Sequence, residues 1–171
     1  MQTSIILTLL GNDRAGLVRA LSRILEQQQG NWTESRMVRM ANKFAGVLQA
    51  TLPTERLDAF MTGLDALRGE GLQITVEQES VTAPGLSESL ALELLGPDHP
   101  GIIHQIADRL AALKVNIEEL TSEQRPAPMS GESLFYASLK LGLPAGVSAE
   151  SVQDALEGLQ DSLMVDLSFH G

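Results

Sequence analysis

The stretch Gly11-Asn12-Asp13-Arg14-Ala15-Gly16 occurs a second time in this chain as Gly96-Pro97-Asp98-His99-Pro100-Gly101. Both glycines and the aspartate recur 85 residues further along (96 − 11, 98 − 13 and 101 − 16). Each copy follows an apolar run typical of a strand and precedes a run with the apolar spacing of a helix. A repeat of this kind predicts two copies of one structural unit.

The repeat extends well beyond the motif. Asn116 matches Asn31 at the same offset of 85. After a Pro- and Gly-rich loop at residues 125–132 the offset becomes 91, as in the pair Phe44 and Phe135. One insertion of six residues (91 − 85) explains the change, and matches on both sides of it argue against chance similarity.

Hydrophobic periodicity predicts the same six elements in each half. The first strand covers residues 3–10 and is apolar on both faces, which predicts burial on both. A helix follows and runs to about Gln29, where Gly30 ends it. Its predicted buried face comprises Leu17, Val18, Leu21, Ile24 and Leu25. Two strands at 31–41 and 43–52 with a tight turn, a helix from Pro53 and a strand at 72–76 complete the first half.

Strand, helix, strand, strand, helix, strand is the split βαβ, or ferredoxin-like, plan. We therefore predict an α+β fold of two ferredoxin-like (βαββαβ) units in tandem, with antiparallel sheets and helices on one face. The predicted boundaries are 1–81 for the first unit, 82–87 for a linker and 88–171 for the second unit. Leucines on both sides of the first strands predict a cover for the other sheet face, supplied by the other half or by a second chain.

Composition and charge exclude several classes of protein. The chain has no cysteine, which removes disulfides and thiolate chemistry. No signal peptide and no apolar stretch of membrane-spanning length are present, so we expect a soluble cytoplasmic protein. The net charge of −10 is uneven, with −1 in residues 1–85 and −9 in residues 86–171. Direct nucleic-acid binding is therefore not expected, and any effect on gene expression should pass through a protein partner.

The repeated motif has the chemistry of a turn at a helix N-terminus. Backbone N–H groups and the helix dipole there attract a carboxylate or a phosphate, and glycines let a ligand approach closely. Asp13 and Asp98 are expected to cap the helices, and Pro100 to lie in the first helical turn. Asn31 and Asn116 are expected to begin a strand beside the first and to reach a ligand in the loop. Turn and cap chemistry alone explains these residues at least as well as a ligand site.

Catalytic and metal sites are not indicated. His99 and His104 are five residues apart, so they do not share a helix face as a zinc pair would, and the third histidine is His170. No G-x-S-x-G elbow or P-loop lysine occurs. Glu118 and Glu119 are adjacent and would point to opposite faces of a strand. We predict a protein that is not an enzyme and that has no catalytic residues, metal site or cofactor.

A strand ending in Gly-x-Asp-x-x-Gly, an apolar helix and an asparagine opening the next strand together resemble the ACT domain. The tandem form, with GPDHPG in its second copy, resembles the glycine cleavage system transcriptional repressor family over essentially the whole chain. The resemblance implies an amino-acid sensor, with glycine as the implied ligand, that regulates transcription through a protein partner such as a DNA-binding activator. The ligand-binding candidates that it implies are Asn12, Asp13, Gly16, Asn31, Asp98, His99, Gly101 and Asn116.

The two loops differ, and alternatives remain. Arg14 and Ala15 stand where the second copy has His99 and Pro100, so the loops need not bind the same ligand. The alternative functions are a ligand-free protein-interaction module and a detached regulatory partner of an amino-acid metabolic enzyme. The sequence also leaves open whether two chains form a homodimer.

Overall fold

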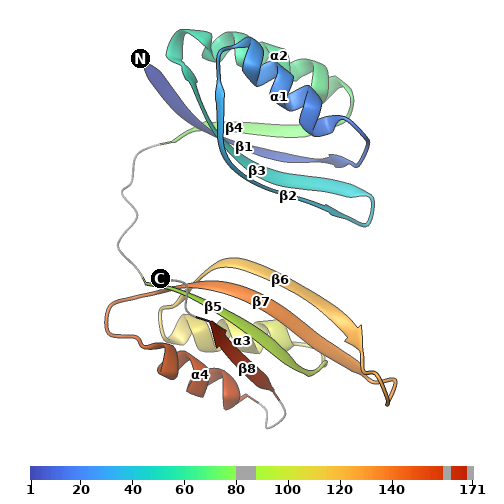
Figure 1. Cartoon of the computed structure of the whole chain (residues 1–171), viewed down its shortest axis with the longest axis vertical. Helices are drawn as coiled ribbons and strands as arrows, with labels where there is room; N and C mark the ends of the chain where they lie inside the picture. Colours follow the sequence, from blue (N-terminus) through green and yellow to red (C-terminus); the bar gives the residue numbers. More distant parts are fainter. Residues whose placement is uncertain (80–87, 160–162, 169–171) are drawn as a thin grey trace. The chain divides into compact units, whose positions relative to one another are not determined.

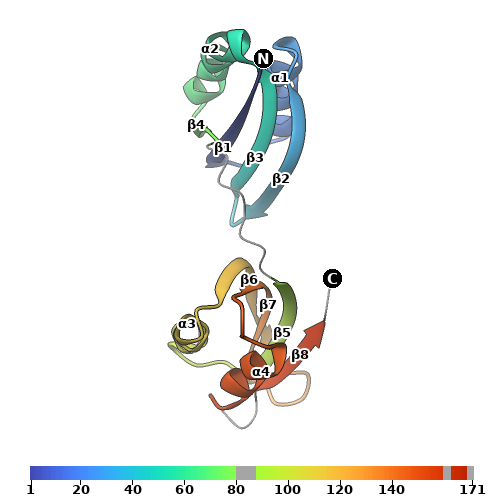
Figure 2. The ribbon, with the colours of Figure 1, turned by 90° about the vertical axis from the view of Figure 1, so that its left-hand side faces the viewer.

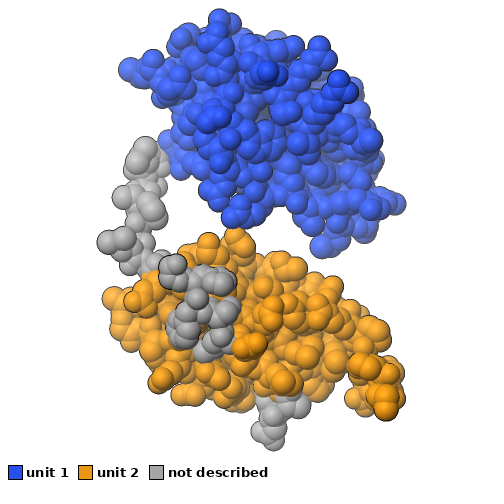
Figure 3. Space-filling model, in the orientation of Figure 1, with its two compact units in different colours: residues 1–82 blue, residues 83–171 orange. Residues whose placement is uncertain are grey.

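The computed structural model describes residues 1–79, 88–159 and 163–168. The chain divides into two compact units, Met1–Thr82 (unit 1) and Ala83–Gly171 (unit 2), shown in separate colours in Figure 3. The predicted linker at 82–87 lies outside the described residues, so the predicted boundaries stay a prediction.

Each unit has the predicted order of elements. Unit 1 consists of β1 (Gln2–Asn12), α1 (Leu17–Gln27), β2 (Asn31–Met40), β3 (Lys43–Pro53), a 3-10 turn η1 (Thr54–Arg56), α2 (Leu57–Gly69) and β4 (Gln73–Gln78). Unit 2 consists of β5 (Glu88–Pro97), α3 (Ile102–Ala112), β6 (Asn116–Pro126), β7 (Ser133–Leu143), α4 (Ala149–Glu157) and β8 (Met164–Ser168).

The two sheets have the same topology. Their strand orders are β2-β3-β1-β4 and β6-β7-β5-β8, and every neighbouring pair is antiparallel. In each unit two helices cover one face of the sheet (Figures 1 and 2). The predicted α+β class and the two ferredoxin-like units are confirmed.

Alternation along the strands builds a separate core in each unit. In unit 1 every second residue of β1, namely Ile5, Leu7 and Leu9, is buried under the helices. The core side of α2 contributes Phe60 and Leu64, both fully buried. Burial of these apolar side chains is what holds the helices on the sheet.

The same backbone hydrogen bond forms at equivalent positions in both units. The N–H of Asp13 donates to the carbonyl of Asn42 over 2.8 Å, and the N–H of Asp98 donates to the carbonyl of Ser133 over 3.0 Å. The donors differ by 85 positions and the acceptors by 91, as the insertion requires. In unit 1 the turn is the predicted tight one, with positive φ at Ala41 (47°) and Asn42 (64°), which suits a two-residue hairpin.

The end of α1 differs from the prediction. Gln29, not Gly30, takes the left-handed conformation, with φ of 58°. The N–H of Gly30 then donates to the carbonyl of Leu25 over 2.9 Å, which closes the helix. A Cβ on Gly30 would lie 2.3 Å from Leu25 Cδ1, so this glycine is required for packing rather than for its backbone freedom.

Burial within the units is less extensive than the apolar pattern predicts. The elements of unit 1 bury β1 on one face only, and Leu10 on its other face is 44% exposed. The cover of that face by the other half or by a second chain stays a prediction. Val18, expected in the core, is 46% exposed, and its counterpart Ile103 is 38% exposed. Both lie at the edge of the apolar stripe of their helix, where periodicity alone does not separate buried from exposed positions.

Candidate functional site

The repeated motif forms the turn between the first strand and the first helix of each unit. α1 follows Gly16, whose φ is 90°, and α3 follows Gly101, whose φ is 89°. These left-handed backbones explain the second glycine of each motif. No side chain accepts a hydrogen bond from the start of either helix, so the expected capping by Asp13 and Asp98 is wrong.

Side chains of the first motif contact neighbouring turns instead of the helix. Arg39 Nε lies 3.1 Å from Asp13 Oδ2, and Lys43 Nζ donates to Asn12 Oδ1 over 2.7 Å, so both contacts tie the loop to the β2–β3 hairpin. Arg14 pairs with Glu70, which caps the end of α2. The Asp13 carboxylate thus pairs with Arg39 on the hairpin, and the first amides of α1 have no side-chain cap.

The second motif makes different contacts. Asp98 Oδ2 accepts a hydrogen bond from Gln124 Nε2 over 2.5 Å, again from the adjoining hairpin strand. His99 Nδ1 lies 3.1 Å from the carbonyl of Pro100. Pro100 precedes the N-cap residue Gly101 and is outside the helix, so its predicted place in the first helical turn is wrong.

Asn31 and Asn116 lie far from the loop of their own unit. β3 separates β2 from β1, and the register places Asn31 opposite Thr51, which faces Ser4. Ser4 is eight residues from Asn12, or roughly 26 Å along the strand. Asn116 has the same place in unit 2, opposite Gly142 and level with Ser89. The expectation that these asparagines lie beside the first strand and reach a ligand in the loop of their own unit is therefore wrong.

The loops combine a helix N-terminus with a nearby carboxylate. The helix dipole and the amides without a side-chain cap at the start of α1 or α3 favour an anion such as a carboxylate. Within a few residues, Asp13 or Asp98 supplies a carboxylate that an ammonium group could contact. In this structure these carboxylates contact Arg39 and Gln124 respectively.

Residues 3–77, from β1 to β4, match a family model described as ACT domain. Unit 2 has the same element order, strand order and loop. Unit 1 is therefore similar to an ACT domain over almost its whole length. Both units share the glycine-flanked turn described above.

Whole-chain comparisons agree with the tandem arrangement. The chain is 23% identical over 161 residues to the glycine cleavage system transcriptional repressor of Escherichia coli (strain K12), covering 92% of this chain and 84% of the relative. The repressor of Shigella flexneri gives the same figures. A crystal structure of an unknown protein from Galdieria sulphuraria matches with a TM-score of 0.88 and 25% identity, covering 100% of both chains.

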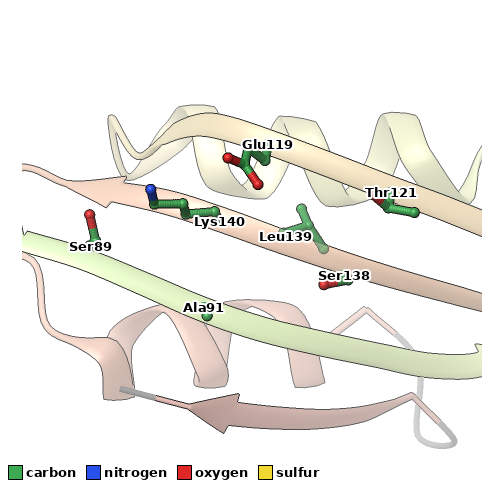
Figure 4. A pocket seen from close by; sticks show the side chains of 7 residues that line it. All are labelled: Ser89, Ala91, Glu119, Thr121, Ser138, Leu139 and Lys140. Carbon is green, nitrogen blue, oxygen red and sulfur yellow. The ribbon is translucent and has the colours of Figure 1, made fainter. Parts of the chain in front are cut away.

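A shallow hollow lies on the helix-free face of the unit 2 sheet (Figure 4). This hollow of about 220 Å³ is lined by Ser89, Ala91, Glu119, Thr121, Ser138, Leu139 and Lys140. It is remote from the loop along β5, because Ser89 lies near the start of the strand and the loop follows its end. Sequence reasoning missed it. The available signal was the repeat, since Ala91 and Ser138 replace the larger Ile6 and Val47 of unit 1.

The same face of unit 2 carries a linked group of polar side chains. Tyr136 Oη donates to Glu93 Oε1 over 2.9 Å, and the Arg125 guanidinium lies 3.7 Å from the centre of the Tyr136 ring. The hydrogen bond to Glu93 raises the pKa of Tyr136 above its usual value, and desolvation adds to the rise.

Tyr136 should therefore titrate at a higher pH than free tyrosine. Because its folded-state pKa is above the unfolded value of about 10, the contribution of this bond to stability is full below that pH and is lost as the pH rises through the folded-state pKa. Tyr136 is the only tyrosine, so phenolate absorbance reports on it alone. Glu93→Gln should move the midpoint back towards 10, whereas Glu88→Gln should not; equal midpoints in all three proteins would contradict the assignment.

In the part of the chain that the structure describes, no group of three or more His, Asp or Glu residues could hold a metal ion. His170 is outside the described residues. Among the described helices, none is long and apolar enough to cross a membrane.

Proposed function

We propose that this chain is a non-enzymatic regulatory protein that senses an amino acid and acts on transcription through a protein partner. The observation that carries the proposal is the similarity to glycine cleavage system transcriptional repressors over 92% of the chain, which includes both units. The helix N-termini, with glycine at the N-cap and no side-chain cap, support the sensing step. A cytoplasmic location follows from such a role.

Glycine is the ligand that we propose, held by the loops after β1 and β5. Its carboxylate would accept from the first amides of α1 or α3, and its ammonium group would contact Asp13 or Asp98. The remaining candidates in the loops are Asn12, Gly16, His99 and Gly101. Asn31 and Asn116 lie too far from the loop of their own unit to contact a ligand held there. The loop of unit 2 is the first to test, because its GPDHPG sequence is the closer match to the family motif.

The proposed partner is a protein such as a DNA-binding activator, rather than DNA itself. Residues 86–171 carry a net charge of −9, which repels a phosphate backbone. In unit 1, three of the cations are paired locally, since Arg14 contacts Glu70, Arg39 contacts Asp13 and Arg68 contacts Asp65. A regulator with this charge distribution needs an intermediary to affect transcription.

Ligand binding should raise the melting temperature of the chain. A ligand that binds only the folded state stabilises it by RT ln(1 + [L]/Kd), or about 1.4 kcal/mol at a tenfold excess over Kd. We expect glycine to give the largest rise in a thermal-shift series against the twenty amino acids. No rise with any of them would contradict the sensing step.

A pair of variants separates ligand binding from stability. Asp98 is half-buried and its bond to Gln124 lies at the surface, so Asp98→Ala should lower the free energy of unfolding by less than about 1 kcal/mol. It should nevertheless abolish the ligand-induced rise. Asp108→Ala, on the exposed side of α3, is the matched control and should keep it. An undiminished rise in Asp98→Ala would exclude the loop of unit 2 as the site.

A further inference from the structure

The helix-free face of the unit 1 sheet carries a cluster of exposed apolar side chains. Leu10, Val38, Met40 and Val47 are 44%, 53%, 68% and 48% exposed. The register places them together, because Leu10 faces Ala45, and Ala45 faces Val38 across the next strand pair. We call these four residues, together with the half-buried Ala45 between them, the apolar patch. Contiguous exposed apolar surface of this kind marks an interaction site more often than scattered single residues do.

Unit 2 shows that the fold does not require this patch. Its sheet has the same topology and register, so corresponding positions can be compared directly. The residues of unit 2 that correspond to Val38, Met40 and Val47 are Glu123, Arg125 and Ser138. Polar and charged side chains therefore suit these positions of the fold, and the apolar ones in unit 1 need another explanation.

The size of the face fits a protein interface. Strands β1, β2 and β3 contain 11, 10 and 11 residues and β4 contains 6. At about 3.3 Å per residue and 4.8 Å between strands, the flat area of the face is roughly 600 Å². Side-chain relief increases the accessible area, which brings it near the 800 Å² or so that each partner buries in a stable complex.

The charge distribution favours a second copy of the chain as the occupant. Two chains of net charge −10 repel each other, and most of this charge lies in residues 86–171. Residues 1–85 carry only −1, so a contact confined to unit 1 keeps the acidic units out of the interface. Near the patch, charge is locally balanced, since Arg36 Nη2 lies 3.3 Å from Glu34 Oε1.

We propose that two copies of this chain form a dimer through the helix-free faces of their unit 1 sheets, with one apolar patch against the other. The same surface is used by both copies, as in a twofold-symmetric contact. Sheets that pack face to face place apolar side chains from both inner faces in a layer about 10 Å thick. The patch supplies such side chains from each copy.

Cross-linking tests which face is used. The chain has no cysteine, so a single introduced thiol reacts alone. Val47→Cys should give a covalent dimer with a short bismaleimide, because the two thiols approach each other across the contact. Val18→Cys is the matched control, since Val18 is 46% exposed but lies on α1. A dimer that cross-links through position 18 and not through position 47 would overturn the proposal.

Sedimentation velocity of the full chain tests the energetics. The wild-type chain should sediment as a dimer of two 18.4 kDa copies, with a concentration-dependent return to monomer. Val38→Glu with Val47→Ser installs the residues that unit 2 has at these positions and should raise the dimer Kd at least tenfold. Val47→Ser alone should raise it less, and Val18→Ser should leave it unchanged.

Two results would overturn the proposal. One is a wild-type chain that stays monomeric up to its solubility limit. The other is a dimer whose Kd is the same in the wild type and in the patch variants, while Trp32 fluorescence shows that unit 1 is folded in all of them. Thermal melts of each variant accompany the sedimentation, so that unfolding is not counted as dissociation.

Discussion

Replacing Phe60 by alanine should lower the free energy of unfolding of unit 1 by about 3–5 kcal/mol. Phe60 is fully buried and is the largest of the fully buried side chains. It lies on α2 in the core formed with β1 and β3. Removing the ring takes away apolar contacts and leaves a cavity that the surrounding Leu and Ile side chains fill only in part.

The effect should be confined to unit 1, because the core of unit 2 is a separate cluster. Trp32 and Tyr136 are the only tryptophan and tyrosine, and they lie in units 1 and 2. In a urea titration, Trp32 fluorescence should shift to lower denaturant while Tyr136 absorbance keeps its midpoint. Leu156→Ala, at a fully buried position of α4, should do the reverse. Equal shifts of both probes would mean that the units unfold together.

The repeat made the fold predictable in detail. Hydrophobic periodicity predicts the element order and the turn at Ala41 and Asn42, and the two offsets add the position of the six-residue insertion. The bonds from Asp13 to Asn42 and from Asp98 to Ser133 obey the same offsets. Internal repetition doubles the number of independent observations for each element, which is why hydrophobic periodicity sufficed here.

The candidate site was less predictable because its contacts are non-local. The N-cap residue of α1, Gly16, is three residues from Asp13, whereas Arg39 is 26 residues away on a hairpin. Asp13 nevertheless pairs with Arg39. Sequence spacing favours the cap, whereas topology brings the cation within 3.1 Å. The error about Asn31 is also one of topology, because the return strand β3 of the hairpin takes the place next to β1.

The apolar patch illustrates a further limit. Apolar residues on both sides of β1 indicate a second apolar face, but the pattern does not show what covers it. Comparison of the two units adds the missing information. Ser138 and Glu123 occupy the positions of Val47 and Val38, so the fold does not require apolar side chains there.

Replacing Gly101 by valine should lower the free energy of unfolding of unit 2 by about 2 kcal/mol. Gly101 precedes α3 with φ of 89° and ψ of 3°, a conformation that costs a β-branched residue about 1–3 kcal/mol. Nothing lies within 4 Å of a Cβ built at this position, so the cost is conformational and not a clash. The Tyr136 transition in urea is the measurement.

Gly101→Asn is the control that isolates the backbone, because asparagine tolerates the left-handed region better than valine does. We expect it to cost less than half as much. Gly11→Ala provides the opposite case in unit 1. Its Cβ would lie 2.7 Å from Leu72 Cδ1, so the cost there comes from packing. If valine and asparagine at position 101 cost the same, the turn has rearranged, and the second glycine of the motif is not there for its conformation. In that case a ligand that approaches the backbone closely would become the better explanation for the glycine in both loops.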